Sequence, residues 1–219
     1  MANFLHPERV SLADLTGRIK TCDLVPSRAA LLDGLDQKIA KFSQQGIVSL
    51  EDLQKTLKNG KKMEALAQST GIDQQYLVLL RREVESYIPK PFKLIEVDWL
   101  PREQLSRLID AGIGNSDDLR AAAQSEDGIT RLVEKTGVEQ SSLEYLVSLA
   151  NLGTVQWVSL NFARMLHEAG YQSAASVAAA DAEVLCERLD QINVGGKYFN
   201  GKVGLRDIKR LVHAASFVI

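Results

Sequence analysis

The sequence predicts an all-α fold built from tandem copies of one small helical unit, and three spacings lead to this prediction. Gly46, Gly112 and Gly170 each have an apolar residue four positions earlier and a helix-capping serine or asparagine three positions later. An apolar residue also stands seven positions after each glycine, and in the first two copies a Thr-Gly pair ends twenty-five positions after it. Repetition at fixed spacing is typical of proteins that stack one supersecondary unit. The preceding apolar residues are Phe42, Leu108 and Leu166, and the capping residues are Ser49, Asn115 and Ser173.

The first repeat is preceded by a leading helix. Ser11 is a good cap, and apolar residues recur at helical spacing from Leu12 to Ile19. A second apolar stripe predicts one helix over residues 29–45, which Gly46 ends because glycine enters the left-handed conformation without a steric cost. Ser49 then begins the next helix, and the carboxylate of Asp52 can reach back to the free amide of the cap.

The remaining elements follow the same order in each repeat. Two short helices are expected after each cap, and longer amphipathic helices are expected over residues 73–88 and 139–152. The third repeat departs from the pattern after Ile192, where four glycines in residues 193–204 predict either a long loop or a short hairpin. Residues 205–217 are expected to form a closing helix.

One break divides the chain. Proline disfavours helix at the residue before it, so Pro89-Lys90-Pro91 predicts a domain boundary or hinge. We therefore expect an N-terminal helical unit over residues 1–90, with the leading helix and repeat one. Residues 91–219 are expected to form a C-terminal helical domain with repeats two and three and the closing helix.

The capped repeats resemble the tandem helix-hairpin-helix-like (SAM-like) repeats of a bacterial family of unknown function, over about residues 29–193. The resemblance implies compact bundles of short helices and implies no reaction. In the wider helix-hairpin-helix class, a Gly-apolar-Gly turn offers backbone amides to a DNA phosphate. That position holds residues 97–101 in repeat two and falls near Gly34 in repeat one. Gly153 and Thr154 in repeat three are the least degraded version of this turn.

Composition narrows the function classes. The net charge is −2, and residues 94–153 carry a net charge of −6, which argues against a continuous nucleic-acid groove. No signal peptide or membrane span is visible. The two cysteines, Cys22 and Cys186, indicate reduced thiols in a cytoplasmic protein. No catalytic, cofactor-binding or metal-ligand pattern is present, so we expect no enzyme activity, no cofactor and no metal.

Two basic patches are the candidate contact sites. Glycine, aromatic and basic side chains together could hold a phosphate or stack a base, although a solvated helix face and a mobile loop would have the same composition. The first patch surrounds Asn59-Gly60 and the second contains Phe199. The candidate residues are Lys55, Lys58, Lys61, Lys62, Gly153, Thr154, Lys197, Tyr198, Lys202, Arg206, Lys209 and Arg210.

Two functions remain open at this point. The first is a non-enzymatic scaffold that binds an unidentified protein partner or itself, which fits the repeats and the acidic middle. The second is a nucleic-acid-binding module that contacts the phosphate backbone through the two basic patches. Trp99 and Trp157 occupy comparable places at the starts of repeats two and three, and we expect both to be core anchors. An exposed pair would instead indicate a protein partner.

Overall fold

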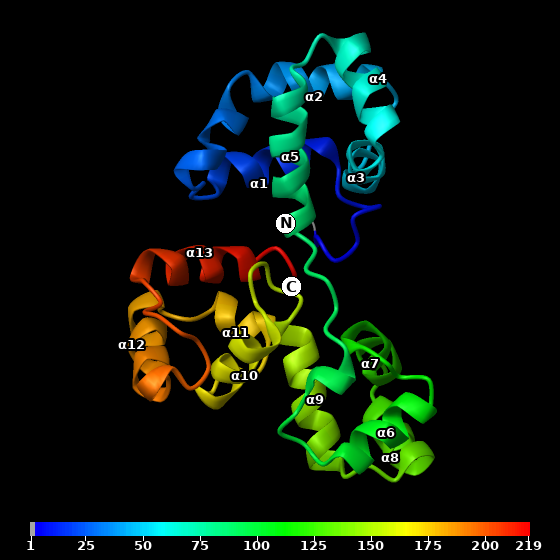
Figure 1. Ribbon diagram of the computed structural model, residues 1–219, viewed down its shortest axis with the longest axis vertical. Coiled ribbons are helices and arrows are strands. Elements are labelled where there is room, and N and C mark those ends of the chain that lie inside the picture. Colours follow the sequence, from blue (N-terminus) through cyan, green and yellow to red (C-terminus); the bar gives the residue numbers. More distant parts are fainter. Residues whose placement is uncertain (1–2) are drawn as a thin grey trace. The chain divides into compact units, whose positions relative to one another are not determined.

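The computed structural model describes residues 3–219, which form two compact units. Unit 1 runs to Ile88 and also contains Phe217–Ile219, and unit 2 spans Pro89–Ser216. The predicted all-α class is confirmed, because the described residues form helices and two isolated bridges, with no named strand (Figure 1). The helices of unit 1 are α1 (Leu12–Thr21), the 3-10 helix η1 (Pro26–Leu32), α2 (Leu35–Gln44), α3 (Leu50–Lys58), α4 (Gly60–Thr70) and α5 (Gln74–Ser86).

Unit 2 contains the longer series of helices. Helix α9 packs against α7, α8 and α10, and helix α13 packs against α11 and α12. The elements are η2 (Leu94–Glu96), α6 (Arg102–Asp110), α7 (Ser116–Ala123), α8 (Gly128–Thr136), α9 (Gln140–Leu152), α10 (Leu160–Glu168), α11 (Ala174–Ala178), α12 (Ala182–Ile192), η3 (Val194–Gly196) and α13 (Leu205–Ala215).

The three repeated glycines end helices α2, α6 and α10 in the same way. Gly46, Gly112 and Gly170 have φ values of 78°, 89° and 90°, so the predicted left-handed conformation is confirmed. The backbone amide of the residue after each glycine donates a hydrogen bond to the carbonyl of the apolar residue four positions before the glycine, at 3.2, 2.9 and 2.9 Å. The glycine amide itself donates to the residue three positions earlier, at 3.0, 2.9 and 2.9 Å. This pair of bonds is the Schellman motif, which satisfies the last carbonyls of a helix.

The helices that follow these turns begin with the predicted caps. Ser49, Asn115 and Ser173 each accept a hydrogen bond from the amide three positions later, and the side chain at that later position accepts one from the backbone amide of the cap. The leading helix has the same box between Ser11 and Asp14. The hydrogen bond from Ser49 is the largest cause of the lowered pKa of Asp52. The sequence therefore fixes the start and the end of each short helix locally.

One predicted helix is wrong. Residues 29–45 are not continuous, because Gly34 has a φ of 57° and separates η1 from α2. The apolar stripe persists across the break, since Leu31, Leu35 and Phe42 are all buried. Periodicity predicted burial correctly, but it missed a left-handed residue inside the stripe. Of the long loop and the short hairpin predicted for residues 193–204, the structure has the loop, which contains η3 and no described strand.

Unit 1 encloses a buried cation. Arg18 is 1% exposed, and its guanidinium carbon lies 4.4, 3.8 and 4.5 Å from the ring centroids of Phe4, Tyr87 and Phe217. The Phe4 amide donates to the Phe217 carbonyl at 2.8 Å, which fixes the third ring beside the other two. Burial lowers the pKa of Arg18 and raises the pKa of Tyr87 well above its usual value. The cage belongs to the hydrophobic core of unit 1 and contains no residue of unit 2.

Among the helices of residues 3–219, none has the combination of length and apolarity that crossing a membrane requires.

Candidate functional site

A pocket of about 250 Å³ opens on unit 2 beside Trp157. Its walls come from the turn before α10, from the first turn of α10, from loop 193–204 and from α13. We call it the Trp157 pocket, and it is lined by Trp157, Ser159, Phe162, Phe199, Lys202, Val203, Asp207, Ile208, Arg210 and Leu211. The lining is mainly apolar, with two cations and one carboxylate.

Trp157 occupies a backbone position that normally requires glycine. Its φ is 68°, and it is the one non-glycine residue with positive φ among residues 3–219. The Val158 amide donates to the Val155 carbonyl at 3.1 Å, so Trp157 is the third residue of a four-residue turn. Positive φ at that position alone is the signature of a type II turn, which favours glycine. A tryptophan there is strained by roughly 1–3 kcal/mol, and such strain tends to lie at functional sites.

The strained turn points the Trp157 ring outward. Trp157 is 47% exposed, whereas Val155, Gln156 and Val158 beside it are buried. The prediction that Trp157 is a core anchor is therefore wrong, because the turn conformation reverses its side chain. The guanidinium carbon of Arg210 lies 4.4 Å from the Trp157 ring centroid, which places a cation on one ring face. Trp99 differs, since it is half-buried and packs against the core of α6 to α9.

Loop 193–204 supplies the second exposed ring, Phe199, which is 47% exposed. The side chain of Asn193 holds the loop closed. Its Oδ1 accepts from the amides of Tyr198 and Phe199 at 3.0 and 3.1 Å, and its Nδ2 donates to the Phe199 carbonyl at 2.9 Å. Gly195, Gly196 and Gly201 have positive φ and allow the tight path. Together these contacts position Phe199 in the wall of the Trp157 pocket.

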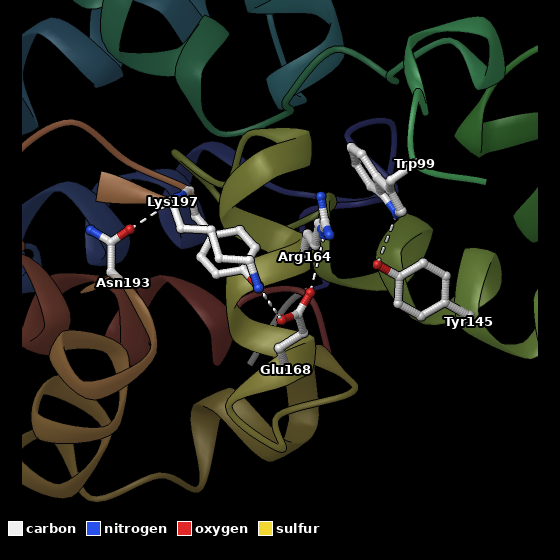
Figure 2. A network of polar contacts seen from close by, with 7 residues as sticks. Trp99, Tyr145, Arg164, Glu168, Asn193 and Lys197 are labelled. Atoms are coloured by element: carbon white, nitrogen blue, oxygen red, sulfur yellow. Dashed lines mark hydrogen bonds and ion pairs between the residues drawn. The ribbon is translucent and has the colours of Figure 1, made fainter. Parts of the chain in front are cut away.

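Tyr198 faces the other way and anchors the loop to α10. It is 7% exposed, and its hydroxyl donates a hydrogen bond to the Glu168 carboxylate. Arg164 Nε donates to the other oxygen of Glu168 at 3.1 Å, and Lys197 Nζ lies 3.4 Å from the first. Figure 2 shows Glu168 held between Arg164 and Lys197. We call the contacts of Glu168 with Tyr198, Arg164 and Lys197 the Glu168 clasp.

The clasp changes the ionisation of Glu168. Partial burial alone would raise the pKa of this carboxyl, but hydrogen bonds from Tyr198 and Arg164 and the charge of Lys197 outweigh it. The net effect lowers the pKa below its usual value, so Glu168 is a carboxylate at neutral pH. The Arg164 guanidinium carbon also lies 4.4 Å from the Trp99 ring centroid, and Trp99 donates to the Tyr145 hydroxyl at 3.1 Å (Figure 2).

A serine and a histidine meet on the inner side of α10. Ser148 Oγ lies 2.7 Å from His167 Nδ1 and also donates to the Gln172 carbonyl at 2.8 Å. Burial lowers the pKa of His167, and its ring meets that of Tyr145 edge to face at 4.7 Å. Ser148 is 9% exposed and lies outside the lining of the Trp157 pocket. The pair joins α9 to α10, which is a structural role.

The predicted residues of the C-terminal patch divide into two groups. Lys202 and Arg210 line the Trp157 pocket, whereas Lys197 and Tyr198 belong to the Glu168 clasp. Arg206 and Lys209 are exposed on α13, outside the lining. A buried Tyr198 has no ring face free for a base. Sequence reasoning did not find Trp157 and Phe162 as lining residues, because the first was assigned to the core and the second has no distinguishing neighbour.

Gly153 and Thr154 do not form an open phosphate-binding turn in this structure. The Gly153 amide donates to the Leu149 carbonyl at 2.9 Å and the Thr154 amide donates to Asn151 at 3.2 Å. Gly153 has a φ of −63°, and Thr154 is 9% exposed. Both amides are thus used to end α9. Neither is available to an incoming anion.

The first basic patch lies in unit 1, at the junction of α3 and α4. Lys55 pairs with Glu51 at 2.8 Å, one turn earlier on α3. Lys58, Lys61 and Lys62 are exposed, and within residues 3–219 none of them has a carboxylate at ion-pairing distance. These three lysines are therefore the least neutralised cations of the predicted set.

Neither a metal site nor a disulfide is formed by the described part of the chain. Residues 3–219 contain no group of three or more histidine, cysteine, aspartate and glutamate side chains that could hold a metal ion. Cys22 and Cys186 are both free thiols. Burial raises the pKa of Cys186, so its thiol is less ionised than usual.

Comparison with known proteins places the Trp157 pocket inside a recognised domain. A family model described as a domain of unknown function (DUF4332) matches residues 100–217, more than half of the chain. No match to a curated protein or to a solved structure was found. The matched region contains every lining residue of the pocket and all of the Glu168 clasp. The chain therefore belongs to the DUF4332 family of domains of unknown function.

Proposed function

We propose that the protein is a non-enzymatic binding module whose Trp157 pocket receives an apolar side chain of a partner protein. The single observation that carries this proposal is the exposed Trp157 ring, held in a strained turn at the pocket wall. A large aromatic ring left in water beside an apolar hollow is the usual form of an interaction hot spot. Glycine would suit this turn better, so the exposed tryptophan ring is held there at a conformational cost.

The size of the pocket favours one side chain over a whole cofactor. Small-molecule sites in proteins usually enclose about 300–1,000 Å³. At about 250 Å³, the Trp157 pocket falls just below that range. Protein interfaces, in contrast, are commonly centred on one buried anchor residue that fills such a hollow. Self-association is the special case in which the anchor comes from a second copy.

The charges around the pocket favour a protein over a nucleic-acid strand. Lys202 lies 3.8 Å from Asp190, Lys209 lies 3.7 Å from Glu183, and Arg210 lies 3.5 Å from Asp207. A run of phosphates would meet these carboxylates as well as the cations, and phosphate-backbone binding depends on unneutralised lysine and arginine. A protein surface of mixed charge has no such conflict.

The test is a selection of displayed random peptides on the whole 219-residue chain. The library is first depleted of peptides that bind the variant Trp157→Gly, which lacks the ring and has a residue suited to the turn. We expect enriched peptides to share an aromatic or aliphatic anchor and to lose binding to Phe199→Ala as well. A protein that enriches no peptides beyond those that also bind Trp157→Gly would refute the proposal. Light scattering of the free protein distinguishes self-association from binding to another protein.

Nucleic-acid binding is a second candidate, carried by a different observation in unit 1. Lys58, Lys61 and Lys62 are exposed cations without carboxylate partners in the described chain. Fluorescence anisotropy with labelled duplex and single-stranded DNA tests it at low and moderate salt. Binding that weakens steeply with salt and is lost when the three lysines become glutamate would establish a phosphate-backbone binder. An unchanged anisotropy at low salt would eliminate this candidate.

Two broader expectations accompany the proposal. The matching turns after α2, α6 and α10 support tandem helix-hairpin-helix-like repeats. The two free thiols support a location in a reducing cytoplasm.

A further inference from the structure

The Trp157 pocket contains an arginine whose hydrogen-bonding capacity is incompletely used. The Arg210 side chain is 16% exposed, and its guanidinium carbon lies over the Trp157 ring. Its Nη1 is 3.5 Å from the Asp207 carboxylate, well beyond the roughly 2.7–2.9 Å of a charge-assisted hydrogen bond. Its buried Nε has no hydrogen-bond partner within residues 3–219. A buried donor without a partner is destabilising, and the loosely paired Nη1 keeps donor capacity for an incoming acceptor.

A second cation at the same pocket is also weakly engaged. The Lys202 side chain is 81% exposed, and its Nζ is 3.8 Å from the nearest carboxylate oxygen, on Asp190. Exposed ion pairs at this separation contribute little to stability, so the lysine can exchange its partner at little cost. Lys202 follows Phe199 on loop 193–204, so one loop brings an aromatic wall and a cation to the pocket.

The local charge is the reverse of that of the surrounding unit. Residues 193–216 carry five basic side chains and one acidic side chain, a formal charge of +4. Unit 2 as a whole, Pro89–Ser216, carries 14 basic and 17 acidic side chains, a formal charge of −3. The cations of this unit are thus concentrated, along the sequence, in the segment that forms the Trp157 pocket, where Glu183 and Asp190 of α12 face two of them. A partner segment with a negative charge is favoured at this place and disfavoured over the rest of the unit.

We infer that the Trp157 pocket recognises a peptide in which an aromatic anchor stands next to a carboxylate, with the anchor against Trp157 and Phe199 and the carboxylate on Arg210 and Lys202. This inference rests on the proposed function and specifies the partner that it requires. One carboxylate on Arg210 and Lys202 meets only Asp207 and Asp190 beside them, whereas a polyanion would also approach Glu183. Arginine is suited to this role because its planar fork accepts a carboxylate at two points.

The inference is tested with three synthetic peptides that differ at one position. Each has a single phenylalanine in a Gly-Ser host, preceded by aspartate, asparagine or lysine. Binding to the full-length protein is followed by NMR through the indole N–H signal of Trp157, which suits weak complexes. We expect the Asp-Phe peptide to bind roughly 3- to 10-fold more tightly than the Asn-Phe peptide, with Lys-Phe the weakest. The difference between aspartate and asparagine should shrink as salt is raised.

Three variants assign the effect to named side chains. Arg210→Gln and Lys202→Gln should each reduce the preference for aspartate. Because the Lys202 side chain is exposed, Lys202→Gln tests the charge without removing a buried group. Lys209→Gln is the matched control, since Lys209 is also on α13 and lies outside the pocket lining. It should leave the preference unchanged.

The outcomes separate this inference from the proposed function. Equal binding of the aspartate and asparagine peptides would overturn this inference, and the proposed function, in which the pocket receives an apolar side chain, would still stand. No shift of the Trp157 signal with any of the three peptides, together with no enriched displayed peptides, would remove both proposals. A shift with oligothymidylate alone would also overturn both and would show that the aromatic walls stack bases.

Discussion

The Arg210 guanidinium covers one face of a tryptophan, Trp157, whose own backbone is in the left-handed region with a φ of 68°. A cation on an aromatic face contributes roughly 0.5–2 kcal/mol. The left-handed conformation of a bulky residue costs roughly 1–3 kcal/mol. The two effects are of similar size, so Arg210 offsets a large part of the strain that exposes the ring. The exposed Trp157 ring is therefore stabilised by the largely buried Arg210 side chain beside it.

The first prediction concerns the backbone at this turn. Trp157→Gly should be more stable than Trp157→Ala by about 1 kcal/mol, because both lose the ring and only glycine adopts positive φ freely. Urea denaturation of the two variants measures the difference. Equal stabilities would mean that the turn relaxes to negative φ once the ring is removed.

The second prediction concerns the repeated helix ends. Gly112→Val should destabilise the protein by roughly 1–3 kcal/mol, because Gly112 has a φ of 89° and open space around it, so only the backbone opposes the change. Gly46→Val should behave alike, since Gly46 has a φ of 78° and is equally uncrowded. Gly17→Ala is the control: Gly17 lies inside α1 without positive φ or a crowding neighbour. It should stabilise by roughly 0.5–1 kcal/mol.

The third prediction is a pH dependence that comes from the Glu168 clasp. The pKa of Glu168 is lowered in the folded protein, so the unfolded chain binds the proton more readily. The stabilisation from Glu168 is present above the usual glutamate pKa of about 4.3 and is lost as the pH falls through the folded value. At pH 7, Glu168→Gln should cost about 1 kcal/mol.

Denaturation of the wild type and Glu168→Gln between about pH 7 and pH 3 checks this prediction, because the gap between the two should close on acidification. Glu134→Gln is the control, since Glu134 is exposed on α8 and takes no part in the Glu168 clasp. A gap that stays constant down to the lowest pH would show that Glu168 acts through packing and not through its charge.

The fourth prediction concerns the aromatic cage in unit 1. Arg18→Ala should cost about 3 kcal/mol, because it leaves a cavity between the rings of Phe4, Tyr87 and Phe217. Arg18→Met fills most of that volume without a buried charge and should stay within about 1.5 kcal/mol of the wild type. Calorimetric melting distinguishes the two. A methionine variant as unstable as the alanine variant would mean that the positive charge itself holds the cage.

The helix ends were predictable because each depends on residues a few positions apart. Gly46, Ser49 and Asp52 specify a helix end and the next helix start without any distant contact, and the structure has all of these bonds. Gly34 was not predictable in this way, because an apolar stripe continues through it. The stripe reports which side chains are buried and does not report the backbone conformation between them.

The Trp157 pocket was only partly predictable. Lys202, Arg210 and Phe199 belonged to a patch that composition marked out, yet Trp157 lies more than 40 residues earlier in the chain. Its inclusion depends on the packing of α13 in unit 2 and on a turn that forces a tryptophan outward. The sequence predicts Tyr198 as a contact residue because glycines and lysines lie close to it in the chain. Its burial depends on Glu168, thirty residues away.

The position of Phe217 has a consequence for the order of events during synthesis. Unit 1 holds Phe217 in its core, and all of Pro89–Ser216 must be made before that residue exists. At about 5–20 residues per second, the ribosome takes on the order of ten seconds to cross this interval. During that time Arg18 and Tyr87 lack their third ring, while every residue of unit 2 becomes available before Phe217 does. The aromatic cage of unit 1 therefore cannot be completed until all of unit 2 has been synthesised.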